Sequence, residues 1–141
     1  MRAALAVGTL VLSVSLTRSD VGEQIARRTA DAYHALPLDQ RERTAIVGES
    51  YIGAAYVDGY SDRYRLPKAY SLSRSYGYFA PPPAERDTVL YVGRDPDPLL
   101  SYFGTSQKVA DIGEDMHAYT LTGRRKPWAE IWSQERTLTV S

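Results

Sequence analysis

The sequence has no cysteine, and its 141 residues carry equal numbers of acidic and basic side chains, 17 of each. The absence of cysteine excludes disulfide bonds and thiolate metal sites, and it is compatible with any compartment. Because the formal net charge is zero, no overall field attracts nucleic acid, which is therefore not an expected partner. The turn Gly48-Glu49-Ser50-Tyr51 lacks the glycine spacing of a dinucleotide or phosphate loop. No nucleotide cofactor is expected.

Motifs for nucleophilic catalysis are also missing. Neither His34 nor His117 has a serine or acidic partner at a known motif spacing, and no Gly-x-Ser-x-Gly elbow occurs. We interpret His34 as a solvated helix residue and place His117 just before the last strand, not as a ligand. Asp111, Glu114 and Asp115 are candidates to gather a cation, but loop acids usually serve solubility. The sequence therefore predicts no catalytic residue and no metal site.

Phenylalanine is scarce, with two residues against eleven tyrosines. Tyrosine suits half-buried positions in which one end of the side chain meets water. The composition fits a groove or an interface, and it equally fits a small domain with a thin core. The chain length is that of one domain with an ordinary hydrophobic core.

The amino-terminal run Ala3–Leu16 is apolar but shorter than the roughly 20 residues that cross a bilayer comfortably. Three interpretations remain open. The run is the core of a signal peptide cleaved near Ser13-Val14-Ser15, a buried element of the domain, or the outer half of a transmembrane helix that begins outside this chain. Arg2 before it favours an extracytoplasmic position for the rest. We expect an anchor-like segment over 1–17, a domain over 18–141, and a cell-membrane location with the soluble part on the extracytoplasmic side.

Short apolar runs alternate with helical patterns after residue 17. Asp20 and Glu23 have capping-box spacing, which predicts that the first helix begins at Asp20, and Pro37 ends it. Further helices are expected at 51–57, 99–103 and 128–132, and strands at 44–47, 67–71, 88–92, 108–112 and 119–122. This alternation predicts an α/β fold: three layers, with a mostly parallel sheet of about four to five strands and flanking helices.

Three of these elements carry further expectations. The 88–92 strand is the most apolar and is therefore expected at the centre of the sheet. The charged stretch 39–43 is expected to be a loop. Trp128 and Trp132 lie four residues apart on a helical face, and we expect them to cover the sheet. The alternative is a position at a membrane interface, where indoles concentrate.

The turn after the first strand is the first candidate binding site. Gly48-Glu49-Ser50 places helix amides at the carboxyl end of the sheet, where ligands of open parallel sheets bind. Glu49, with Tyr51 beside it, is a candidate acceptor for sugar hydroxyl groups. The alternative is that Glu49 or Ser50 only caps the helix.

An aromatic loop is the second candidate site. Ser73, Arg74, Tyr76 and Tyr78 precede a run of three prolines. Aromatic faces next to a hydroxyl and a guanidinium suit carbohydrate recognition, because sugar C–H faces stack on rings. Equally, these tyrosines pack the loop onto the edge of the sheet.

Four segments together carry a family resemblance: 48–60, 66–83, 88–93 and the tail 119–132. They resemble the soluble C-terminal domain of bacterial GT-C type membrane glycosyltransferases, the lipid-phosphate-sugar mannosyl- and aminoarabinosyltransferases of the 39/83-like families. The resemblance covers roughly residues 20 to 132. It implies an extracytoplasmic domain that helps to position a glycan or polyprenyl-phosphate-sugar substrate.

In that family the catalytic acid lies upstream, in the membrane portion, and no residue here matches it. The resemblance therefore implies that this chain alone does not transfer sugar. At the aromatic loop, the family's tryptophan, glycine, asparagine and histidine correspond to Phe79, Ala80, Arg74 and Ser73, so that site does not carry over. The alternative is an independent membrane-tethered module of Rossmann-like fold that binds carbohydrate or another ligand. A small hydrolase would need a catalytic pair that only the folded chain could assemble.

Overall fold

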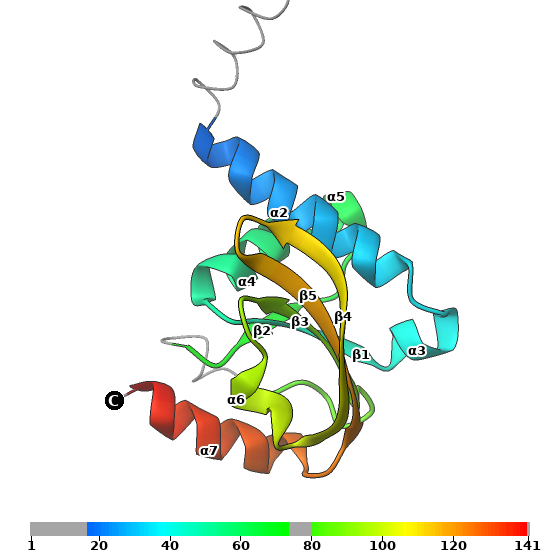
Figure 1. Ribbon diagram of the computed structural model, residues 1–141, viewed down its shortest axis with the longest axis vertical. Coiled ribbons are helices and arrows are strands. Elements are labelled where there is room, and N and C mark those ends of the chain that lie inside the picture. The colour runs from blue at the N-terminus through cyan, green and yellow to red at the C-terminus, as the bar shows by residue number, and fades with distance from the viewer. Residues whose placement is uncertain (1–16, 74–79, 141) are drawn as a thin grey trace, which may run out of the picture.

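The computed structural model describes residues 17–73 and 80–140, and for 17–20, 51, 52 and 136–140 only the backbone is described (Figure 1). The predicted apolar segment therefore lies outside the described residues except for Thr17. No helix in the described ranges is both long and apolar enough to cross a membrane. The elements in chain order are α2 Thr17–His34, α3 Leu38–Glu42, β1 Thr44–Gly48, α4 Tyr51–Gly59, α5 Ser61–Tyr64, β2 Ala69–Ser71, β3 Thr88–Gly93, α6 Asp97–Leu100, β4 Phe103–Gly113, β5 Met116–Arg124 and α7 Trp128–Val140.

The five strands form one mixed sheet in the order β2-β1-β3-β5-β4. The pairs β1–β2 and β1–β3 are parallel, whereas β3–β5 and β4–β5 are antiparallel. The predicted α/β class, strand number and central position of 88–92 are confirmed. The prediction of a mostly parallel sheet is wrong, because only Glu114 and Asp115 separate β4 from β5. So short a connection allows a hairpin but no crossover.

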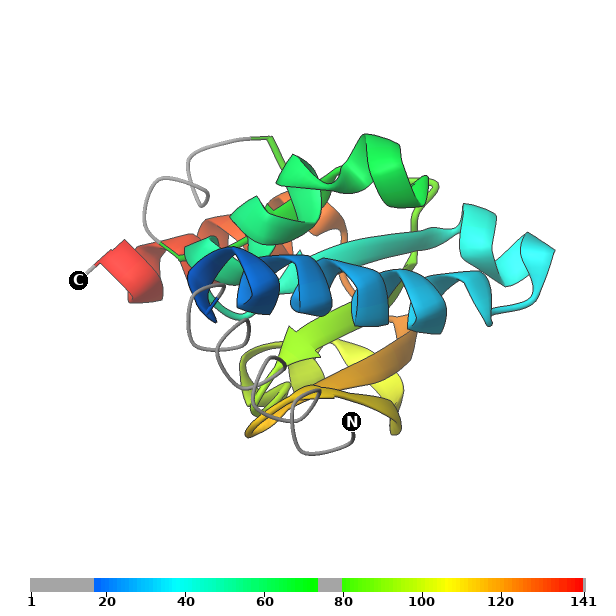
Figure 2. The ribbon, with the colours of Figure 1, turned by 90° about the horizontal axis from the view of Figure 1, so that it is seen from above.

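Helices cover both faces of the sheet, as Figure 1 shows. On one face α2 and α4 pack against Ile46, Leu90 and Val92, all nearly inaccessible to water. Figure 2 shows these two helices over the sheet. The two helices pack so closely that a Cβ at Gly22 of α2 would lie only 2.7 Å from the Tyr56 ring of α4, so this contact needs glycine. Burial on this side follows the alternation of side chains along each strand.

On the other face α6 and α7 cover Val89, Tyr91 and Leu121. Trp128 and Trp132 are each 3 % exposed and pack edge to face, with ring centroids 5.7 Å apart. The prediction that these tryptophans cover the sheet is confirmed. Large buried aromatic side chains supply much of the apolar burial in a core of this size.

Several element boundaries differ from the predictions. The described part of α2 already includes Thr17, so Asp20 lies inside the helix and is not its first residue. The charged stretch after Pro37 forms the short helix α3. The helix expected at 99–103 is Asp97–Leu100, and β4 already begins at Phe103. Helix ends are the least determined by periodicity, because tertiary packing overrides weak local preferences.

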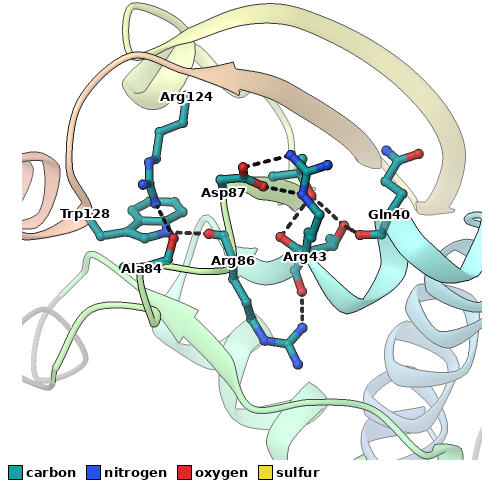
Figure 3. Close-up of polar contacts among 9 residues, drawn as sticks. Gln40, Arg43, Ala84, Arg86, Asp87, Arg124 and Trp128 are labelled. Carbon is teal, nitrogen blue, oxygen red and sulfur yellow. Dashed lines mark hydrogen bonds and ion pairs between the residues drawn. The ribbon is translucent and has the colours of Figure 1, made fainter.

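The amino ends of β1 and β3 are fastened by a group of polar contacts, called here the amino-end cluster (Figure 3). The Arg86 guanidinium donates to the Thr44 carbonyl, and the Trp128 indole donates to the Arg86 carbonyl, both at 2.5 Å. Arg43 donates twice to Asp87, at 3.0 and 2.8 Å. The cluster thus joins both strands to α7 at the end of the sheet opposite the candidate site.

Candidate functional site

The candidate site lies where the connections after β1 and β3 diverge. The chain leaves β1 for α4 on one face of the sheet, and it leaves β3 for α6 on the other face. In open α/β sheets this divergence leaves a crevice beyond the carboxyl ends of the strands, and ligands bind there. A pocket of about 280 Å³ occupies this position, here called the switch-point pocket, lined by Glu49, Ser50, Gly53, Val92, Gly93, Arg94, Glu114, Asp115 and Met116.

Glu49 is held in place over the last residue of β3. Its backbone N–H donates to the Val92 carbonyl at 2.9 Å. Its Oε1 accepts from the Tyr91 hydroxyl at 3.4 Å and from the Asp95 amide at 3.2 Å. This position requires glycine at 93, because a Cβ there would lie 2.5 Å from the Glu49 Cβ. The hydrogen bonds from Tyr91 and Asp95 are both made to Oε1 of the carboxylate.

Tyr91 is 2 % exposed, and its hydroxyl donates to the Glu49 carboxylate. Its burial raises the pKa of the phenol well above the ordinary value, and the negative charge of Glu49 raises it further. The phenol therefore stays protonated and continues to donate to Glu49 throughout the neutral range.

Ser50 is the helix cap and Glu49 is not. The Ser50 hydroxyl accepts from the Gly53 amide at 3.1 Å, which is a standard amino-terminal cap of α4. The Glu49 carboxylate instead accepts from Tyr91 and Asp95. Of the two alternatives for this turn, capping applies to Ser50 alone, and the Glu49 carboxylate remains at the pocket.

The charges around the switch-point pocket favour a neutral or cationic ligand. Glu49, Glu114 and Asp115 contribute three carboxylates, and Arg94 contributes one guanidinium. Their sum is negative and opposes the entry of a bare phosphate group. Carboxylates accept hydrogen bonds from hydroxyl groups, and the guanidinium donates to ring or hydroxyl oxygens.

A second pocket adjoins the first. It has a volume of about 320 Å³, lies between α2 and the β4–β5 hairpin, and shares Glu114 and Met116 with the switch-point pocket. Its other lining residues include the apolar Val21, Ile25 and Ile112. A ligand with a hydroxylated end and an apolar end would meet matching surfaces in the two pockets.

The other predicted site residues have different positions. Ser73 follows β2, and its hydroxyl lies 3.0 Å from that of Ser71, so its hydrogen bonding is local. The side chain of Tyr51 lies outside the described residues, as do Arg74, Tyr76 and Tyr78 entirely.

Only Glu49 among the predicted residues therefore lines the switch-point pocket in the described part of the chain. Sequence reasoning did not place Arg94, Glu114 or Asp115 at this pocket, and it weighed Glu114 and Asp115 only as cation ligands in a loop. A signal existed for Arg94, because β1 and β3 both end in glycine and residues that follow parallel strands meet at one edge. The hairpin acids reach that edge only through antiparallel pairing.

His117 lies inside β5, not before it, and is paired with Asp111 of β4. Its Nδ1 is 2.7 Å from Asp111 Oδ1, and Lys108 lies 3.0 Å from the same oxygen. Hydrogen bonds from Lys108 and then His117 lower the pKa of Asp111. No hydroxyl in the described ranges is hydrogen-bonded to this histidine. Within the same ranges, no group of three His, Cys, Asp or Glu side chains is placed to hold a metal ion.

Comparison of the chain with protein-family models, curated proteins and solved structures found no match. The geometry of the pocket therefore carries the functional argument.

Proposed function

We propose that this chain is the extracytoplasmic domain of, or is derived from, a membrane-bound glycosyltransferase that uses a lipid-linked sugar donor. In this proposal the switch-point pocket binds the sugar and helps to position the substrate, while the reaction takes place in a separate membrane portion of the enzyme. The observation that carries the proposal is the carboxylate of Glu49, fixed by Tyr91 and Asp95 at the mouth of a pocket in the place where α/β sheets bind ligands.

The pocket suits a sugar better than a phosphate. Sugar hydroxyls would donate to Glu49, Glu114 and Asp115, and sugar oxygens would accept from Arg94. The excess of negative charge opposes a phosphate group, so the sugar end of a lipid-linked donor is the part expected to enter. The adjoining apolar pocket is a surface for the apolar portion of such a ligand.

The experiment is a titration of the full chain with a panel of methyl glycosides and, separately, with inorganic phosphate, followed by amide NMR shifts. At least one glycoside should shift the amides of Gly93 and Arg94, and phosphate should not. Glu49→Gln should weaken binding by about tenfold or more, because a hydrogen bond to a charged acceptor contributes about 1.5–3 kcal/mol. The matched control is Glu42→Gln, which alters an exposed glutamate of α3.

Two results would contradict the sugar site: no glycoside shifts these amides, or Glu42→Gln weakens binding as much as Glu49→Gln does. The position within a larger enzyme has a separate test. An in-frame coding region for several hydrophobic spans immediately upstream would support the glycosyltransferase. Its absence, together with sugar binding, would favour an independent binding module instead.

A further inference from the structure

β4 is an unusually open edge strand. It is the last strand in the sheet order and runs for 11 residues from Phe103 to Gly113 (Figure 1). Residues 104–109 are all exposed, and the strand contains no proline. An edge strand of this length presents backbone N–H and C=O groups that another strand can pair with.

A groove of about 350 Å³ runs between α2 and this edge, here called the α2–β4 groove. Its apolar lining residues are Ala32 of α2, Ala35 directly after α2, and Val109 and Ala110 of β4. Val109 is 42 % exposed and lies at a shift of register between β4 and β5. The irregularity leaves an aliphatic side chain partly exposed at the open edge.

The charges along the groove are arranged so that they complement themselves. α2 carries Arg28 and then Asp31, and β4 carries Lys108 and then Asp111, so each element has a base three residues before an acid. In a two-fold arrangement, each element of one copy lies antiparallel to the same element of the other copy. The base on each element of one copy then faces the acid on the same element of the other.

We propose that the α2–β4 groove is the contact surface between two copies of this chain, which associate about a two-fold axis near Val109 and Ala110. Lysines and bulges in an edge strand ordinarily oppose pairing. Here the lysine already lies 3.0 Å from Asp111 of its own chain and, across the two-fold axis, also faces the Asp111 of the second copy. The chain's net charge of zero removes net repulsion between copies. A strand is the occupant that satisfies both the open backbone edge and the apolar groove, and the second copy supplies one with complementary charges.

The first experiment is cross-linking through a single cysteine, which is clean because the natural chain has none. Val109→Cys places a thiol next to the axis, and Leu38→Cys, on the 64 % exposed Leu38 of α3, is the matched control. With a short bis-maleimide, Val109→Cys should form dimers about tenfold faster than the control, because association raises the effective concentration of the thiols. Equal rates for the two variants would overturn the proposal.

The second experiment measures mass against concentration by sedimentation equilibrium of the full chain. The average mass of the natural chain should rise above its 15.7 kDa as concentration rises. Lys108→Asp and Asp111→Lys should each weaken association at least about tenfold, since each sets like charges face to face, and the double reversal should restore it. Thermal melts of all three variants identify any loss of folding.

A monomer at every concentration would overturn the inference, as would folded variants in which the double reversal associates no better than the single ones. Neither result bears on sugar binding, which takes place at the switch-point pocket. The two proposals therefore fail independently.

Discussion

Replacing Gly93 with alanine tests whether the pocket is built as described. An ideal Cβ at this position would lie 2.5 Å from the Glu49 Cβ, 3.0 Å from its Oε1 and 3.1 Å from its Cδ. The shortest of these contacts involves the Cβ, which no change of side-chain rotamer can move. The turn after β1 must therefore shift as a whole, against the hydrogen bond that ties Glu49 N–H to Val92.

The expected cost of Gly93→Ala is about 1–3 kcal/mol, the usual range when an extra methyl group is forced into a packed site. With a urea dependence of about 2 kcal/mol per molar, a loss of 2 kcal/mol lowers the unfolding midpoint by about 1 M. The displaced carboxylate also loses its donors, Tyr91 and Asp95. Glycoside binding, measured below the unfolding range, should therefore fall by more than the loss of stability alone predicts.

The assay is urea unfolding followed by tryptophan fluorescence, with the NMR titration run on the same samples. Gly59→Ala is the control, because an added Cβ there meets nothing within 4 Å and the residue ends α4. This control should be neutral or slightly more stable. If Gly93→Ala changes the midpoint no more than Gly59→Ala does and leaves glycoside binding intact, the account of the pocket is refuted.

Two further predictions concern the other end of the sheet. Trp128→Phe should lower the free energy of unfolding by about 1–3 kcal/mol more than Trp132→Phe does, because it leaves the Arg86 carbonyl without its indole donor. The buried Trp132 indole N–H, in contrast, has no partner in the described part of the chain. Equal urea midpoints for the two variants would refute this prediction. The Arg43 hydrogen bond lowers the pKa of Asp87, so this pair stabilises the fold above the unfolded carboxyl pKa of about 3.9 and loses its effect as pH falls through the lower folded pKa. Asp87→Asn should therefore lose less stability than the natural chain as pH falls below about 4. The difference is small because both side chains are exposed to solvent; identical acid profiles would contradict the prediction.

The parallel half of the sheet was predictable from the sequence. The runs Thr44–Val47 and Thr88–Val92 are continuous and apolar, as strands buried on both faces must be. Each is followed by glycine, and the first is followed by a polar turn that begins a helix. That pattern was sufficient to predict both strands, to place 88–92 at the centre of the sheet and to select Glu49 as a site residue.

The antiparallel half was not predictable in the same way. β4 is exposed at 104–109, so it carries little of the apolar signal from which strands are recognised. Without that signal its start was placed at Lys108 instead of Phe103, and its pairing with β5 was not foreseen. The hairpin acids Glu114 and Asp115 consequently appeared as ordinary loop residues, although the fold brings them to the pocket.

The sequence by itself determined the α/β class, the buried strands and the two tryptophans that cover the sheet, because all of these follow from local apolar periodicity. Only the tertiary structure decided which charged residues meet. Arg94, Glu114 and Asp115 join Glu49 through strand order and pairing direction, and both depend on contacts between residues far apart in the chain. A periodic pattern reports which face of an element is buried, but it carries no information about which neighbour buries it.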